Sequence, residues 1–191
     1  PHAGRAGALP YLGLMMKTLL IALLLQAAPL QTPADRLDER LEALSSATAE
    51  EAVPLVDEIT ALWADSGSDT ISLLMDRGEA AAMEGDLVLA ARMFDHVTEI
   101  EPDFSEGWLR AAQIAAGRED WAYALEALNE TLTVEPRRFD AYLLLGRTLE
   151  RAERPESALE AYDEALAIYP QFELARRAAA RIRAALAGRP L

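Results

Sequence analysis

The residues best suited to acid–base or metal chemistry lie in one short stretch around the histidine at position 96. Asp95 and Glu99 flank His96 at spacings that place all three near one another on a helix, where a histidine and a carboxylate could hold a metal ion. Two protein ligands on a solvated surface are too few for a closed metal site, which takes four. The other histidine, His2, lies in the N-terminal leader region. We therefore interpret His96 and its neighbours as ordinary surface residues and expect no catalytic, metal or cofactor site.

The composition argues against several further function classes. The 191 residues contain no cysteine, carry a formal net charge of −14 and include 6% aromatic residues. The absence of cysteine removes disulfides, thiolate metal sites and a cysteine nucleophile. A chain with this negative charge lacks the basic surface that binds the phosphates of a nucleic acid. No glycine-rich phosphate loop and no Gly-x-Ser-x-Gly motif occurs. We therefore predict a helical protein that is not an enzyme and has no nucleic-acid partner.

The elements that position these residues repeat along the chain. Pro102, Pro136 and Pro170 stand 34 residues apart, and each closes an apolar stretch. An interval of this length is typical of helical arrays. Glycine, aspartate or proline interrupts each unit near its middle, which predicts two helices joined by a tight turn. The columns that recur at the same interval are Leu74, Trp108 and Tyr142; Gly78, Ala112 and Gly146; Ala90, Ala124 and Ala158; Phe94, Leu128 and Tyr162; and Val97, Thr131 and Ala165.

This unit resembles the tetratricopeptide repeat. The best match is the last unit, through Tyr142, Leu145, Gly146, Ala158, Tyr162, Ala165 and Pro170. The resemblance implies an all-α fold, a right-handed α-solenoid of three helical hairpins within residues 69–170. The expected units are residues 71–104, 105–138 and 139–170. Small columns let the helices approach closely, and large columns fill the space between hairpins.

Two further elements are predicted beside the repeats. Apolar residues at helical spacing indicate an N-terminal helical hairpin over residues 35–68, which we expect to cap the exposed face of the array or to form a fourth, degenerate unit. Thr48 and Glu51 have the spacing of a capping box, so the second helix begins at Ala49 with Pro54 inside it, or else nearer Val53. Residues 171–191 are expected to form a C-terminal capping helix with a polar outer face.

The N-terminal 34 residues have the layout of a leader. Lys17 precedes an apolar run from Thr18 to Leu25, and small and polar residues follow, which is typical of a secretory signal peptide. Residues 1–14 are rich in glycine and alanine, and we interpret them as a non-native or upstream segment. We expect export to the periplasm, with no stable membrane insertion after the leader is removed. The alternative is a protein tethered to the membrane by an uncleaved N-terminal segment.

The resemblance also implies a groove. In tetratricopeptide arrays the first helix of each hairpin lines the concave side, so the expected groove residues are Met75, Glu79, Leu109, Gln113, Leu143 and Arg147. Three of them make an apolar track at the repeat interval. Some family members bind a peptide's terminal carboxylate through cationic and amide side chains, but Met75 and Glu79 occupy the first-unit positions of that clamp. Either the track binds a peptide or partner helix through an apolar anchor, or the N-terminal hairpin or C-terminal helix covers it.

These observations lead to one function hypothesis and one alternative. We predict a protein–protein interaction module, an adaptor or scaffold that binds a peptide or partner protein in its groove without cofactors. The alternative is a structural or self-associating subunit whose repeat faces mediate homo-oligomerisation. Residues 34–106 hold 19 acidic residues against 4 arginines, which is either a solvated surface or a docking face for a basic partner.

Overall fold

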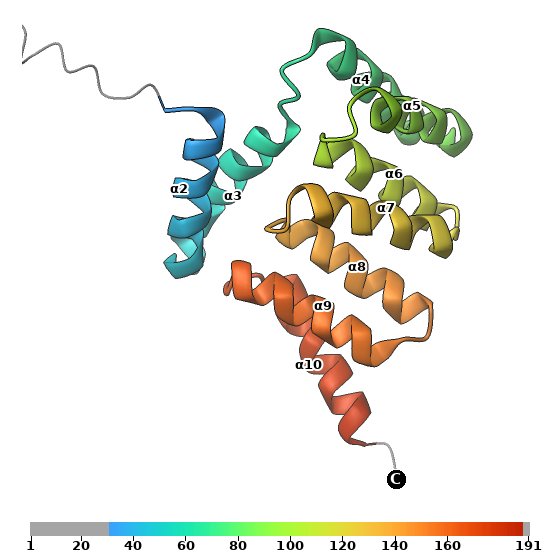
Figure 1. Ribbon diagram of the computed structural model, residues 1–191. Helices are drawn as coiled ribbons and strands as arrows, with labels where there is room; N and C mark the ends of the chain where they lie inside the picture. The colour runs from blue at the N-terminus through green and yellow to red at the C-terminus, as the bar shows by residue number, and fades with distance from the viewer. Residues whose placement is uncertain (1–30, 189–191) are drawn as a thin grey trace, which may run out of the picture. The chain divides into compact units, whose positions relative to one another are not determined.

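The computed structural model describes residues 31–188, which form nine helices and no strand (Figure 1). The all-α prediction is therefore confirmed for this part of the chain. Most connections are short, as expected when consecutive helices lie side by side. The helices are α2 (Pro33–Ser46), α3 (Ala49–Ala64), α4 (Asp69–Met83), α5 (Leu87–Ile100), α6 (Ser105–Gly117), α7 (Trp121–Val134), α8 (Phe139–Arg151), α9 (Pro155–Ile168) and α10 (Glu173–Ala187).

The second helix of each repeat begins where the sequence predicts a turn. Asp86 caps α5 by accepting a hydrogen bond from the Leu89 amide at 2.9 Å, and Asp120 caps α7 in the same way. α9 begins with Pro155, whose missing N–H leaves no helix bond unmade at that position. The residue before the N-cap of each second helix has a positive φ: 81° at Gly85, 60° at Glu119 and 57° at Glu153. The three hairpins therefore share one turn geometry, although only the first turn has a glycine in the left-handed conformation.

Each hairpin is closed by a small residue on its first helix and a large one on its second. A Cβ atom added to Gly78 would lie 2.7 Å from the ring of Phe94, and one added to Gly146 would lie 2.6 Å from Cδ1 of Tyr162. Both rings are fully buried. α10 continues the array by packing on α9, where Ala175, Ala179 and Ile182 are buried. One small and one large column thus meet between the two helices of one hairpin, whereas Val97 of another column lies against Gly107 of the next hairpin.

Gly146→Ala is expected to destabilise the protein by roughly 1–3 kcal/mol, because the added methyl group overlaps the Tyr162 ring. Gly117→Ala is the matched control. Gly117 also lies in the first helix of a repeat, and a Cβ there would meet only Leu87 at 3.9 Å. The control should be neutral or slightly stabilising, since alanine favours helix over glycine. Urea denaturation of both variants measures the difference, and equal midpoints would contradict the close packing at Gly146.

The N-terminal hairpin has the helix start that its sequence predicts. Thr48 accepts a hydrogen bond from the Glu51 amide at 3.4 Å, and the Glu51 carboxylate accepts one from the Thr48 amide at 2.9 Å. α3 therefore begins at Ala49, with Pro54 inside the helix. Arg40 of α2 forms an ion pair with Glu58 of α3, which links the two helices.

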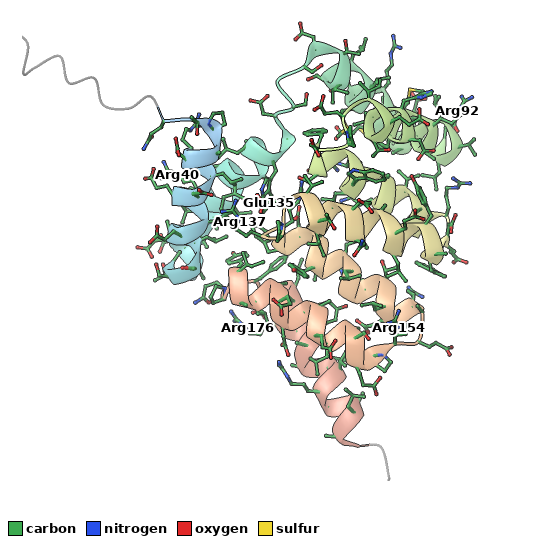
Figure 2. The ribbon with its side chains drawn as sticks, in the orientation of Figure 1. Arg40, Arg92, Glu135, Arg137, Arg154 and Arg176 are labelled. Atoms are coloured by element: carbon green, nitrogen blue, oxygen red, sulfur yellow. The ribbon has the colours of Figure 1, made fainter. Side chains whose placement is uncertain are left out.

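The expected position of this hairpin was wrong. Its apolar side packs on the beginning of the third repeat and the end of α9, where Phe139 lies between three other rings at centroid distances of 5.3–5.5 Å: Trp63, Tyr169 and Phe172. Arg137 fixes the same contact by pairing with Asp38 at 2.6 Å and with Glu135 at 2.9 Å (Figure 2). α2 and α3 thus pack on this aromatic cluster and not on the first repeat, so α4 keeps an exposed face on which Leu73 is 50% exposed.

The expected leader lies mostly outside the described residues. Its predicted end at Ala34 falls in the first turn of α2, where the Asp35 carboxylate accepts hydrogen bonds from the Thr32 amide and hydroxyl at 2.9 and 2.8 Å. These bonds hold the pKa of Asp35 below its ordinary value. Within residues 31–188 no helix is long and apolar enough to cross a membrane.

Candidate functional site

The three residues around His96 do not converge on one site. His96 Nδ1 lies 3.3 Å from a carboxylate oxygen of Glu99, and both side chains are exposed. Asp95 is engaged elsewhere, because its Oδ1 accepts a hydrogen bond of 2.8 Å from the Tyr123 hydroxyl on α7. Burial and this hydrogen bond raise the pKa of the Tyr123 hydroxyl. The described residues contain no group of three or more histidine, aspartate or glutamate side chains that could hold a metal ion.

The six expected groove residues do not form one open surface. The apolar members Met75, Leu109 and Leu143 are only 9%, 2% and 8% exposed. Gln113 and Arg147 are exposed, and Glu79 is half-exposed. Leu109 and Gln113 line a cleft of 390 Å³, and α3 forms its other wall through Asp57, Thr60, Ala61 and Ala64. Arg147 lines a separate cavity. The N-terminal hairpin thus lies beside the centre of the expected track.

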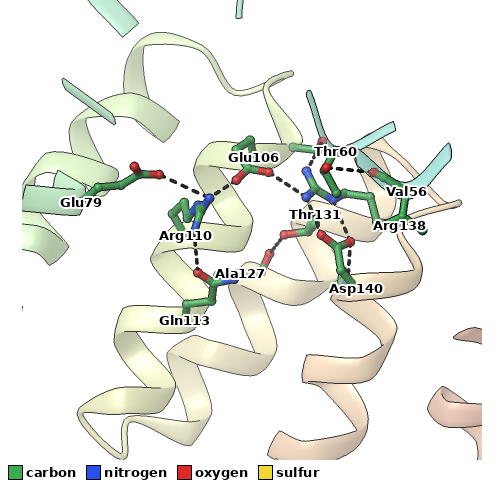
Figure 3. Close-up of polar contacts among 12 residues, drawn as sticks. Val56, Thr60, Glu79, Glu106, Arg110, Gln113, Ala127, Thr131, Arg138 and Asp140 are labelled. Carbon is green, nitrogen blue, oxygen red and sulfur yellow. Dashed lines mark hydrogen bonds and ion pairs between the residues drawn. The ribbon is translucent and has the colours of Figure 1, made fainter. Parts of the chain in front are cut away.

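A chain of alternating charges crosses the first helices of the three repeats (Figure 3). Arg110 on α6 lies 3.3 Å from Glu79 on α4 and 2.7 Å from Glu106. The other oxygen of Glu106 accepts a hydrogen bond of 2.7 Å from Arg138, which also pairs with Asp140 at 2.8 Å. The chain of ion pairs links three successive hairpins, so it fixes their relative positions.

Arg138 is the most buried member of this chain of charges. Its side chain is 2% exposed, the Glu106 side chain is 6% exposed, and the guanidinium carbon lies 4.6 Å from the centroid of the Trp63 ring. Burial disfavours the charged form of Arg138, but its bonds to Asp140 and Glu106 outweigh that effect and hold its pKa above the ordinary value. Because the guanidinium satisfies the carboxylates of α6 and α8 and also packs on α3, it joins the N-terminal hairpin to the array.

The second cavity is basic, although the protein is acidic. It has a volume of 560 Å³ and lies between the C-terminal half of α8, the beginning of α7 and α10. Trp121 forms one wall. Its charged lining residues are three arginines and one glutamate: Arg147, Arg151, Arg181 and Glu150. The lining therefore carries a formal charge of +2.

The single acidic residue of this cavity is already bound. Arg181 donates two hydrogen bonds to the Glu150 carboxylate, at 2.6 and 2.9 Å, and the Tyr162 hydroxyl donates a third. Burial raises the pKa of Glu150, but the bonds from Arg181 and Tyr162 outweigh it, so this pKa lies below its ordinary value. Neither Arg147 nor Arg151 has a carboxylate within 4 Å among residues 31–188. Both guanidinium groups are exposed at the rim and can accept an anionic partner.

The described residues form one known class of fold. Stacked helical hairpins that share a turn geometry and a small-to-large contact are an α-solenoid of repeats. Within that class, residues 139–182 match the model of the tetratricopeptide repeat. A TPR repeat-containing protein of Rhizobium etli is 28% identical over 158 residues, which cover 82% of this chain and 78% of the relative.

Solved structures show the same fold at low sequence identity. The first TPR domain of RPAP3 bound to the HSP90 peptide SRMEEVD is 19% identical with a TM-score of 0.60, over 62% of this chain and 94% of that domain. MamA from MSR-1 is 16% identical with a TM-score of 0.54, over 81% of this chain and 87% of MamA. The tetratricopeptide-repeat match and the all-α solenoid therefore agree with the prediction from the sequence.

Sequence reasoning missed most of the basic cavity. It included Arg147 but not Arg151, although the two stand four residues apart on one helix and so share a face. That spacing was the available signal. Trp121 begins α7 and Arg181 belongs to α10, so their proximity to α8 depends on how two hairpins and the C-terminal helix stack. The pair of Glu106 and Arg138 was also missed, since the two residues are 32 positions apart.

Proposed function

We propose that this chain is a non-enzymatic interaction module that binds an acidic peptide segment of a partner protein in the basic cavity. The observation that carries the proposal is the pair Arg147 and Arg151, two exposed guanidinium groups without a carboxylate within 4 Å among the described residues. Arginine is well suited to hold carboxylates because its planar group donates two parallel hydrogen bonds. Trp121 offers an apolar wall for the side chain beside the bound carboxylate.

The buried track argues against an apolar anchor as the main contact. Met75, Leu109 and Leu143 expose too little surface for a ligand to contact without moving the helices around them. Arg147, Arg151 and Trp121 are accessible without such movement. The peptide bound by the RPAP3 domain contains two adjacent glutamates and a terminal aspartate, and this supports an acidic ligand for a related fold. Because that domain is only 19% identical to this chain, the proposal rests mainly on the residues that line the cavity.

Arg147→Glu is expected to weaken binding of an acidic peptide at least tenfold, because it removes one carboxylate contact and adds a repulsive charge. The probe is a fluorescein-labelled peptide of alternating glutamate and leucine, and fluorescence anisotropy measures its affinity. The same peptide with glutamine for glutamate should bind at least tenfold more weakly to the unaltered protein. Added salt should weaken binding of the acidic peptide.

Arg92→Glu is the control, since it makes the same change of net charge on α5, where Arg92 is exposed and does not line the cavity (Figure 2). It should leave the affinity within about twofold, because a distant exposed charge is screened. Equal losses in the two variants would show that overall charge, not the cavity, attracts the peptide. Thermal melting of both variants checks that the fold is intact. No measurable binding of the acidic peptide to the unaltered chain would contradict the proposal.

We also propose that the protein acts in the periplasm after removal of its leader. The basis is the run from Thr18 to Leu25 behind Lys17, and the alternative is an uncleaved segment that tethers the protein to the membrane. Mass spectrometry of the native protein distinguishes the two, because cleavage predicts an N-terminus near Asp35. An intact leader in the membrane fraction would favour the tether.

A further inference from the structure

The first helix of the array has an uncovered face. On α4, Leu73 is 50% exposed, and Asp76, Arg77, Ala80 and Glu84 are exposed on the same side, three to four residues apart along the helix. The other side of α4 packs into the core through Ile71 and Met75. Helices that end a repeat array normally carry a polar outer face or a covering element. Because α2 and α3 pack on the third repeat, no helix of residues 31–188 covers this side of α4.

The last helix of the array has an exposed face of the opposite charge. On α10, Leu174 is 53% exposed, and Arg177 and Arg181 are exposed on the same side, three and seven residues further along the helix. The helix contains four arginines and one acidic residue, a formal charge of +3. Arg176 and Arg177 share Glu173, while Arg181 and Arg183 pair with Glu150 and Asp163, so the four arginines and their three carboxylates keep a net charge of +1. α4 and α5 together, residues 69–100, hold seven acidic residues and two arginines, a formal charge of −5. Each end of the array therefore presents a leucine among charges, and the charges of the two ends are complementary.

We propose that the exposed face of α4 binds the exposed face of α10 of a second copy of this chain, head to tail. Leu73 and Leu174 are the apolar centres of this contact, and Asp76 and Glu84 face the arginine-rich helix. Contact of α4 with α4 would bring acidic residues together, and contact of α10 with α10 would bring arginines together. Like charges at an interface are unfavourable, so the charge pattern selects the pairing of unlike ends.

The geometry of this contact determines the assembly that it forms. A heterologous contact leaves one α4 face and one α10 face open at the ends of each dimer, so further copies add unless the chain of copies closes into a ring. A contact between single helices is small, and small interfaces are typically transient. We therefore expect a concentration-dependent series of oligomers. This inference goes beyond the proposed peptide binding, which needs only one copy.

Sedimentation velocity of the mature chain over a hundredfold range of concentration tests the proposal. The average mass should rise with concentration and fall when sodium chloride is raised, because the charges at the contact are screened. Leu73→Gln and Leu174→Gln each remove one apolar centre without adding charge, and each should weaken association at least tenfold. Val53→Gln is the control, since Val53 is a similarly exposed apolar residue (59%) on α3. It should associate as the unaltered chain does.

Mixing the two variants distinguishes the pairing of unlike ends from other modes. The Leu73→Gln chain keeps an intact α10 face, and the Leu174→Gln chain keeps an intact α4 face. Their mixture should therefore form a 1:1 complex that stops at two copies, while each variant alone stays mainly monomeric. A single copy at every concentration of the unaltered chain would overturn the proposal. So would a Leu174→Gln chain that associates normally while Leu73→Gln does not, because that result indicates contact of α4 with α4.

Discussion

Arg138→Ala is expected to lower the free energy of unfolding by about 3–5 kcal/mol, the range for a buried ion pair that loses one partner. The substitution leaves the Glu106 carboxylate, 6% exposed, with Arg110 on one oxygen but without the guanidinium group that lies 2.7 Å from its other oxygen. It also removes the group that packs over the Trp63 ring at 4.6 Å, so the N-terminal hairpin loses part of its attachment. Urea denaturation, followed by circular dichroism, measures the change.

A double substitution separates the two reasons for this loss. In Glu106→Leu with Arg138→Met, apolar side chains replace both partners, so no charge is left buried and unpaired. Such replacements are often neutral or stabilising. We therefore expect the double variant to be more stable than either single variant, with a coupling energy of at least about 2 kcal/mol between the two positions. A loss below about 1 kcal/mol for Arg138→Ala alone would contradict the structural role of this pair.

Leu109→Glu is expected to destabilise the protein by roughly 4 kcal/mol or more. Leu109 is 2% exposed, so glutamate there loses the buried contacts of leucine and also places a carboxylate in the core. Arg110 does not compensate for this new carboxylate, because its guanidinium group is already paired with Glu79 and Glu106. An open groove predicts a small change of melting temperature for the same substitution, since an exposed residue contributes little to folding.

Gln113→Glu provides the matched control for this substitution. Gln113 lies one turn further along α6, lines the same cleft and is exposed. A carboxylate there remains in water and lies near Arg110, whose Nη1 is 3.3 Å from the Gln113 side-chain oxygen. We expect a change within about 0.5 kcal/mol. Thermal melting of the two variants thus compares glutamate at a buried position with glutamate at an exposed one. A Leu109→Glu protein as stable as the unaltered chain would indicate that the track opens readily.

The sequence by itself determined the repeat and most of the helix boundaries. The interval between prolines, the aspartate caps and the capping box at Thr48 depend on residues a few positions apart, and such local contacts can be read in sequence order. The pairing of Gly146 with Tyr162 could also be predicted, because the two residues belong to one hairpin. The family resemblance followed from these columns, and it correctly predicted an all-α solenoid.

Only the tertiary structure decided where the N-terminal hairpin lies and which side chains reach a ligand. Asp38 and Arg137 are 99 positions apart. Glu150 of α8 and Arg181 of α10 are 31 positions apart. Whether such residues meet depends on how whole helices pack, and periodicity carries no information on it. Leu109 is an example. Its position in the repeat predicts that it lies on the concave side, but its burial depends on the neighbouring helices that pack beside it, including α3. The sequence therefore determines the array, because its contacts are local, and the packing of helices distant in sequence decides which of its surfaces remain open.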